Sequence, residues 1–200
     1  DFGAKQVEVT AFYDEEFVKA LELAAKRAGV PAGTQGEREK ALDHGTMIPL
    51  TFLAERELPC RIVRIGLSGL DAAAHYRLGK CIKKVAEELD RDTVLIASGD
   101  LSHKLLASGP YGYVPEGPLF DEQATKAMAE GDFLKLLSFD PVLCESAAEC
   151  GLGSLRILAG ALDRQAVKSE LLSYEGPFGV GYAVACFTPE GADERRAFDL

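Results

Sequence analysis

A strand–helix–strand succession in the middle of the chain constrains the fold more than any other sequence feature. Residues 93–97, Thr-Val-Leu-Ile-Ala, form an uncharged and β-branched run, which is typical of a strand buried on both faces. A second apolar run over 61–67 lies between Pro59 and Ser68-Gly69. The segment between the two runs has helical periodicity over 71–89, with Asp71 as its cap. This alternation predicts the α/β class.

Further predicted elements flank this unit. A short strand is expected near Val7–Ala11, followed by a helix that Asp14 caps and Gly29 ends, and by a loop over 30–40. Downstream of a Gly, Pro and Tyr loop at 108–118, helices are expected over 119–130, 132–148 (broken at Pro141) and 151–163, and closing strands over 167–174 and 180–187. The last two strands resemble a hairpin, so we expect a layered and mixed sheet.

Charge excludes one class of partner. Lys and Arg total 22 against 32 Asp and Glu, which gives a net charge of -10. Such a surface repels a phosphate backbone, and the densest basic cluster, Lys80, Lys83 and Lys84, fits the solvated face of a helix. We therefore expect no nucleic-acid binding. No apolar stretch is long enough to span a bilayer and no signal peptide opens the chain, so no membrane partner is expected.

The cysteines favour reduced thiols. The chain has five, at positions 60, 81, 144, 150 and 186, and no pair has CxxC spacing. Neither a zinc knuckle nor a disulfide framework is indicated, and we expect a cytoplasmic protein. The chain opens at Asp1 without a methionine, and its last residues, 190–200, are polar like a linker. We therefore expect that both ends continue in a longer polypeptide.

Two of the three histidines occupy positions suited to chemistry. His103 follows the predicted strand 93–97 through a turn of small residues, and functional groups of α/β sheets gather at such strand ends. The alternative is a histidine that only stabilises its own turn. His44 lies in Asp43-His44-Gly45 before a predicted helix, where Asp43 either orients the imidazole or only caps the helix. His75 lies within the predicted helix 71–89, and we assign it no function.

One carboxylate is notable among the 32. Glu149 precedes Cys150-Gly151 at a break between predicted helices, in apolar surroundings where a charge usually needs a partner. The partner is either a metal ion or the start of the next helix. Asp100 is expected to bond within its own turn, and Cys150 is read as a small buried residue. No nucleophile elbow, P-loop or dinucleotide fingerprint occurs.

Several strings resemble one family of enzymes. Leu42-Asp43-His44-Gly45-Thr46 and Ile96 to His103 resemble two motifs of LigB-type class III extradiol ring-cleavage dioxygenases. Pro110-Tyr111-Gly112-Tyr113, Glu149-Cys150-Gly151 and Tyr174 to Tyr182 are most similar to the dioxygenase-like half of AmmeMemoRadiSam system protein A, a relative of Memo. The resemblance covers essentially the whole chain. It implies one catalytic domain over 1–189, with three α/β/α layers and a mostly parallel central sheet.

The resemblance also implies a site. In the family, two histidines and a carboxylate bind Fe(II), leaving positions for a catechol and dioxygen. His103 matches the acid–base residue and His44 a residue near the oxygen, while Asp43, Ser102 and Tyr182 match the substrate-binding region. Glu149 is the expected metal ligand, with Cys150 as the alternative because Memo proteins use a cysteine nearby. The two histidine ligands are expected in an N-terminal segment missing from this chain, which should then bind Fe(II) poorly.

Three functions remain open at this point. The leading hypothesis is an Fe(II)-dependent extradiol dioxygenase acting on a small aromatic substrate and dioxygen. The second is a Memo-like metal-binding partner of a radical-SAM system without ring cleavage, and the third is a metal-dependent hydrolase in the same pocket. A second C-terminal domain and a homo-oligomer are compatible with the resemblance.

Overall fold

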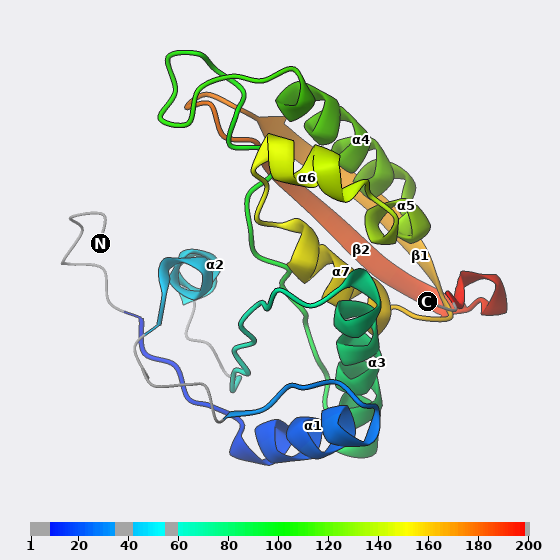
Figure 1. Cartoon of the computed structure of the whole chain (residues 1–200). Coiled ribbons are helices and arrows are strands. Elements are labelled where there is room, and N and C mark those ends of the chain that lie inside the picture. Colours follow the sequence, from blue (N-terminus) through cyan, green and yellow to red (C-terminus); the bar gives the residue numbers. More distant parts are fainter. Residues whose placement is uncertain (1–8, 35–41, 55–59, 199–200) are drawn as a thin grey trace.

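The computed structural model describes residues 9–34, 42–54 and 60–198, and Figure 1 shows their arrangement. In chain order its helices are α1 (Glu15–Arg27), α2 (His44–Ala54), α3 (Ala72–Glu88), α4 (Glu116–Glu130), α5 (Phe133–Leu137), α6 (Pro141–Ala147) and α7 (Leu152–Ala161). Two strands follow, β1 (Gln165–Glu175) and β2 (Tyr182–Ala192), and then a short 3-10 helix, η2 (Glu194–Arg196). None of the helices in these ranges is both long and apolar enough to cross a membrane.

Helices α1 and α3 form the lower part of the molecule in Figure 1. Aspartates begin both helices, because the Asp14 carboxylate accepts the Phe17 N–H at 3.0 Å and the Asp71 carboxylate accepts the Ala74 N–H at 2.7 Å. The apolar faces of the two helices then pack into one cluster, to which Ile157 of α7 also belongs. Both caps therefore fix where an amphipathic helix starts and which face it buries.

Helices α3 and α7 cross at unusually close range. A Cβ atom on Gly79 of α3 would lie 2.0 Å from the carbonyl oxygen of Ile157, and one on Gly160 of α7 would lie 2.0 Å from that of Tyr76. Any side chain at either position would push the two backbones apart. The glycines thus set the position of α7, whose first residue follows directly after Cys150-Gly151.

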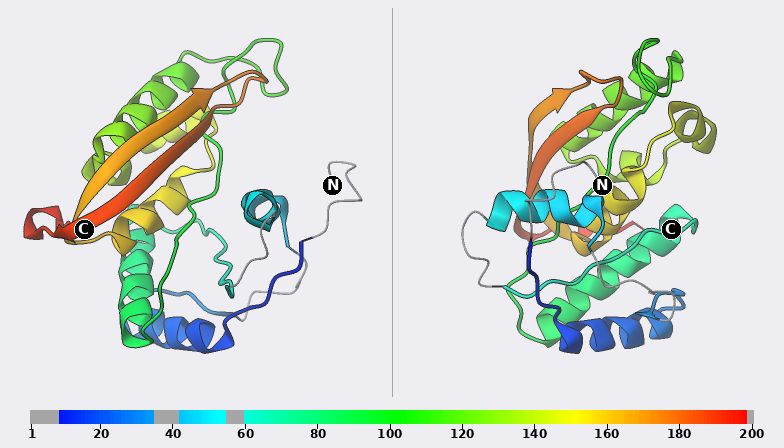
Figure 2. Two further views of the ribbon diagram at one scale, coloured as in Figure 1. Left: turned by 180° about the vertical axis from the view of Figure 1, so that it is seen from behind. Right: turned by 90° about the vertical axis from the view of Figure 1, so that its left-hand side faces the viewer.

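Strands β1 and β2 form an antiparallel hairpin that runs from the pair Gln165 and Ala192 to the pair Glu175 and Tyr182. Helix α4 lies along this hairpin, as Figure 2 shows, and helices α5 and α6 pack against α4. Alternate β2 residues face these helices because strand side chains repeat every second residue. One example is Phe187, whose ring centroid lies 5.4 Å from that of Phe133.

A buried aspartate joins α4 to the hairpin and to the loop after residue 97. The Asp121 carboxylate accepts the Ser102 N–H at 2.7 Å and, on its other oxygen, the Tyr174 hydroxyl at 2.7 Å. Burial raises the pKa of Asp121, and these two hydrogen bonds offset part of that rise. A Cβ atom on Gly181 would lie 2.0 Å from an Asp121 oxygen, so only glycine fits beside this carboxylate.

Most predicted helices are confirmed, and so is the α/β class. The break at Pro141 separates α5 from α6, and the expected hairpin forms, although its strands extend to 165–175 and 182–192. The predicted strand at 7–11 and the loop at 30–40 lie partly outside the described residues. Residues 190–198 contact the rest of the chain, because β2 continues to Ala192 and the guanidinium of Arg196 donates to the Gly131 carbonyl at 2.8 Å.

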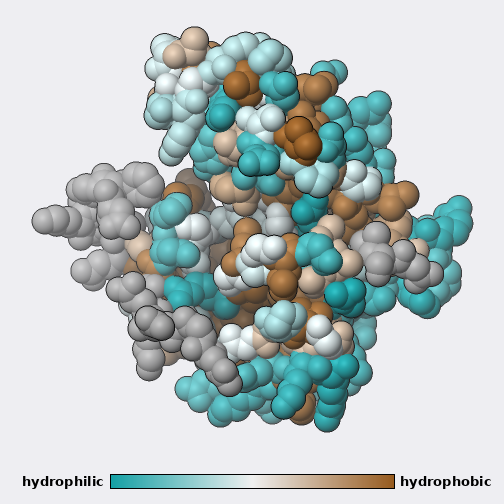
Figure 3. Space-filling view, viewed as in Figure 1, coloured by the Kyte–Doolittle hydropathy of each residue, from teal (hydrophilic) through white to brown (hydrophobic). Residues whose placement is uncertain are grey.

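The mostly parallel central sheet is confirmed only in part. Among the described residues, a parallel bridge joins Tyr13 to Ile62, and the segments 61–67 and 93–97 otherwise form no ladder. The predicted strands there are therefore confirmed only at Ile62, because a strand needs a hydrogen-bonded neighbour, which local sequence does not supply. Apolar side chains such as Leu67 and Leu70 stay exposed, and Figure 3 shows hydrophobic atoms open on the central part of this face.

The close crossing of α3 and α7 yields a first prediction. Gly79→Ala should lower the free energy of unfolding by about 1–3 kcal/mol, because the new methyl group meets a backbone carbonyl that cannot rotate away. Urea unfolding followed by circular dichroism measures this change. Gly69→Ala is the matched control, since a Cβ atom there meets nothing within 4 Å. Equal stability of the two variants would contradict the proposed role of the crossing.

The buried carboxylate yields a second prediction. Asp121→Asn should cost about 1–3 kcal/mol in urea unfolding, because an amide keeps one acceptor oxygen and turns an N–H₂ group toward one of the two donors. Tyr174→Phe removes only one donor and should cost less. An Asp121→Asn protein as stable as the wild type would show that these hydrogen bonds contribute nothing.

Candidate functional site

Two loops meet at one end of the described core. Residues 98–103 follow the extended segment 93–97, and residues 148–151 join α6 to α7. Asp100, His103 and Cys150 each offer one ligand atom, and these atoms all lie within 4.8 Å of one another. Oxygen, nitrogen and sulfur donors therefore converge from positions that are 50 residues apart in the sequence.

Glycines allow the two loops to approach. A Cβ atom on Gly99 would lie 2.5 Å from the Cα of Gly151, and one on Gly151 would lie 2.9 Å from the carbonyl oxygen of Asp100. At that range the Cys150 N–H donates to the Asp100 carbonyl at 3.2 Å, and the Asp100 N–H donates to the Cys150 Sγ at 3.2 Å. Close contact of the two backbones and these two hydrogen bonds thus hold Asp100 beside Cys150.

His103 is held beside Asp100 on the same turn. Its Nε2 lies 3.5 Å from an Asp100 carboxylate oxygen, and its backbone N–H donates to the Ala147 carbonyl at 3.1 Å. Its Nδ1 is buried and, among the residues that the structure describes, has no hydrogen-bond partner. A buried ring nitrogen without a partner is costly, so a water molecule or a ligand that bonded to it would stabilise the loop.

An aromatic side chain covers the imidazole. The rings of Tyr111 and His103 are 5.1 Å apart at 88°, an edge-to-face contact. Tyr182 begins β2 nearby, and burial raises the pKa of its phenol, with smaller contributions from the charges of Asp100 and Tyr111. Sequence reasoning missed Tyr111, although it lies in the Pro110-Tyr111-Gly112-Tyr113 string, because nothing local shows which side chain this loop turns toward His103.

Glu149 lies next to the site, but its carboxylate bonds to the backbone at the start of α7. One carboxylate oxygen accepts the Leu152 N–H at 2.7 Å, at the start of α7. Burial raises the pKa of Glu149, and this hydrogen bond offsets part of the rise. The group of clustered donors contains Cys150 rather than Glu149. Of the two metal ligands considered from the sequence, the cysteine is the one placed among other donors.

Asp43 and His44 lie at the exposed start of α2, outside the three-residue donor group. The Asp43 carboxylate accepts the Thr46 N–H at 2.9 Å, which caps the helix, and contacts with Thr46 hold the pKa of Asp43 below its usual value. A proline in this helix leaves one carbonyl available for a hydrogen bond to Ser98, which precedes the site. Pro49 has no N–H for the Gly45 carbonyl, which instead accepts the Ser98 hydroxyl at 2.7 Å.

Ser102, expected in the substrate-binding region, is fully buried. Its hydroxyl donates to the Ala147 carbonyl at 2.9 Å and accepts the Lys104 N–H at 3.0 Å. These bonds fasten the loop that carries Asp100 and His103 to the end of α6.

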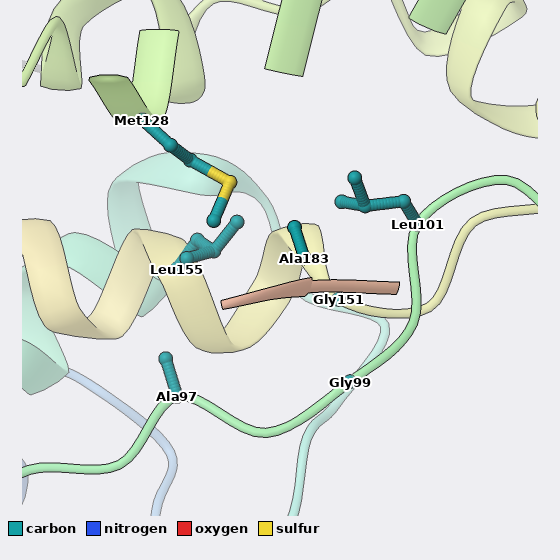
Figure 4. Close-up of a pocket in the computed structure, with 7 residues that line it drawn as sticks. All are labelled: Ala97, Gly99, Leu101, Met128, Gly151, Leu155 and Ala183. Atoms are coloured by element: carbon teal, nitrogen blue, oxygen red, sulfur yellow. The ribbon is translucent and has the colours of Figure 1, made fainter. Parts of the chain in front are cut away.

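A small pocket lies behind the two loops, shown in Figure 4. Its walls are apolar side chains and the two facing glycines, namely Ala97, Leu101, Met128, Leu155, Ala183, Gly99 and Gly151. Asp100 and Cys150 adjoin these glycines in the sequence. The lining of this pocket does not include Asp100, His103 or Cys150 themselves.

The donor set fits a divalent transition metal. A carboxylate, an imidazole and a thiol within 4.8 Å are the ligand types that zinc, iron and copper sites share, whereas calcium and magnesium prefer oxygen alone.

Comparison with known proteins places the chain in a family. Residues 1–185 match the model of the catalytic LigB subunit of aromatic ring-opening dioxygenase. Protein CA_C1420 of Clostridium acetobutylicum is 43% identical over 143 residues, which cover 72% of this chain and 31% of that protein. A MEMO1 family protein of Thermococcus onnurineus is 35% identical over 187 residues, covering 84% of this chain and 59% of that protein.

The similarity extends to other archaeal proteins. A MEMO1 family protein of Pyrococcus furiosus, PF1638, is 33% identical over 135 residues, covering 60% of this chain and 43% of that protein. The chain thus spans from about a third to three fifths of the length of these relatives. Because the family model matches nearly the whole chain, the protein belongs to the LigB family of aromatic ring-opening dioxygenase catalytic subunits and is related to the MEMO1 proteins.

Proposed function

We propose that this chain is a Memo-like metal-binding domain, in which Asp100, His103 and Cys150 bind a divalent transition metal. The observation that carries the proposal is the convergence of three different donor atoms within 4.8 Å. The relatives named MEMO1 family proteins support it, and so does the sulfur donor, which is unlike the histidine and carboxylate ligands expected of an extradiol enzyme.

Each residue has a distinct task in this proposal. Cys150 provides the thiolate, whose metal affinity depends on loss of its proton. Asp100 accepts the Cys150 N–H on its backbone carbonyl, and its carboxylate would bind the metal and offset part of the metal's positive charge. The backbone bond from His103 to Ala147 holds the imidazole in place. Glu149 stabilises the start of α7 and is not a ligand.

Cobalt(II) titration tests the metal site. The wild-type chain should bind one equivalent and show a thiolate-to-cobalt charge-transfer band in the near ultraviolet. Cys150→Ala should lose the band and weaken binding by on the order of 100-fold, because the soft ligand is gone. Cys186→Ala, at an exposed cysteine of the hairpin, is the matched control and should keep both.

A companion variant separates the two ligand hypotheses. Glu149→Gln should retain the charge-transfer band and most of the affinity, because its carboxylate serves the Leu152 N–H. If Glu149→Gln lost the metal while Cys150→Ala kept it, the assignment of ligands would be reversed. The absence of any band in the wild-type chain would reject the thiolate site itself.

The second candidate is Fe(II)-dependent ring cleavage of a catechol, with His103 as the residue that moves the proton. Two observations favour it. The imidazole lies beside the Asp100 carboxylate, which can orient it as a carboxylate orients a general base, and Tyr111 and Tyr182 supply aromatic surfaces near the reacting position. When bound, Fe(II) would supply the electron transfer between the aromatic ring and dioxygen.

Oxygen uptake by the Fe(II)-loaded chain, offered a panel of catechols, distinguishes the candidates. The metal-binding proposal predicts no uptake, and it predicts that His103→Ala loses the metal, because a ligand has been removed. Ring cleavage predicts uptake in the wild type and a His103→Ala variant that keeps its iron but loses at least about 100-fold in rate, as expected for a general acid–base group. Iron content measured beside uptake makes the two results distinct.

A further inference from the structure

Tyr111 is an exposed side chain that nevertheless packs on a residue of the donor group. Its side chain is 59% exposed and belongs to neither buried cluster. The His103 imidazole, by contrast, is 17% exposed, and the Tyr111 ring meets it edge-to-face at 5.1 Å. Aromatic rings favour this arrangement, so the contact restrains the plane of the imidazole. Tyr111 therefore acts on the site more than on the core.

The loop that carries Tyr111, residues 104–114, is closed at its base. Leu105 and Tyr113 form an antiparallel bridge, which joins the two arms of the loop. Gly112 follows Tyr111 directly and has a φ of 78°, a conformation that side chains other than glycine rarely adopt. The turn that directs Tyr111 back toward His103 thus depends on a glycine.

This loop is also fixed to the turn between β1 and β2. The Leu105 N–H donates to the Gly179 carbonyl at 3.1 Å, and a Cβ atom on Gly179 would lie 3.3 Å from the Cα of Gly109. Figures 1 and 2 show the loop and this turn side by side at one end of the molecule. Tyr111 therefore extends from a backbone that is held at several points.

Polar contacts alone fix the imidazole of His103 weakly. Its Nε2 lies 3.5 Å from the Asp100 carboxylate, which is long for a hydrogen bond, and its Nδ1 has no partner among the residues that the structure describes. The bond that turns a histidine ring has broad energy minima. A packing contact such as that of Tyr111 is then needed to hold one orientation.

We propose that Tyr111 is a positioning residue, whose ring holds the His103 imidazole in the orientation that turns Nε2 toward Asp100. The proposal rests on the metal-binding function proposed above, in which both residues are ligands. A ligand side chain that is already oriented loses less conformational freedom when the metal binds. The effect of Tyr111 is therefore on affinity and on the geometry of the bound metal.

The imidazole signals test the contact without a metal. The chain has three histidines, so the spectrum of a protein with isotope-labelled histidine should show three sets of ring signals, and His103→Ala identifies one set. The ring current of Tyr111 should displace the His103 signals from their random-coil positions. Tyr111→Phe should keep this displacement because the ring remains, and Tyr111→Leu should lose most of it.

Cobalt(II) binding tests the consequence for the metal. Tyr111→Leu should weaken binding by about 3- to 10-fold, as expected for the loss of one aromatic contact, and should shift the visible bands of the bound cobalt. Tyr111→Phe should match the wild type in both. Tyr113→Leu, on the same loop and 52% exposed, is the matched control and should also leave both unchanged. Urea unfolding at the same midpoint shows that each variant is folded.

Several outcomes would overturn the proposal. Unchanged imidazole signals in Tyr111→Leu would mean that the ring does not hold His103, and lost displacement with unchanged affinity would mean that the orientation does not matter. Equal weakening by Tyr113→Leu would assign the effect to the loop as a whole. A wild-type chain that binds no cobalt(II) would instead refute the proposed metal site, and displacement lost only in Tyr111→Leu would then still support the orientation of His103 by Tyr111.

Discussion

The close crossing of α3 and α7 is the constraint on which the rest of the site depends. Gly79 and Gly160 let two helical backbones touch, and Ile157 and Tyr76 present their carbonyls where side chains would otherwise stand. Because the crossing fixes the axis of α7, it also fixes the loop that precedes this helix and carries Cys150. The position of the Cys150 thiol thus depends on two residues that have no side chain.

The same principle recurs at the site itself. Gly99 and Gly151 bring the loops of Asp100 and Cys150 into contact, and hydrogen bonds of the backbone hold them there. Asp121 secures the loop at Ser102 from the opposite side. Donors mounted on such a framework lose little conformational freedom when a ligand binds, which is a requirement for a preorganised site. Side-chain chemistry is therefore added to a geometry that glycines and main-chain bonds determine.

Local sequence predicts what local interactions determine. Asp14 and Asp71 mark helix starts because each cap bonds within three residues, and Pro141 marks a break because it lacks an N–H. Whether the segment 93–97 pairs with another strand could not be predicted, since pairing depends on a neighbour elsewhere in the chain. For the same reason His103 could be proposed from its place after an apolar run, but its association with Cys150 could not. Glu149 illustrates the limit, because a carboxylate in apolar surroundings suits a helix cap and a metal equally well.

The extended segment 93–97 and the loop 98–103, which carries Asp100 and His103, are one continuous stretch of chain. Residues 94–97 have no backbone partner among the described residues, yet Ser98 and Asp100, one and three positions later, bond to Gly45 and Cys150. Motion of an unpaired strand would therefore reach Asp100 directly. The rigidity of residues 93–97 and the affinity of any ligand bound at Asp100 should accordingly be coupled, because both depend on the conformational freedom of the same few residues.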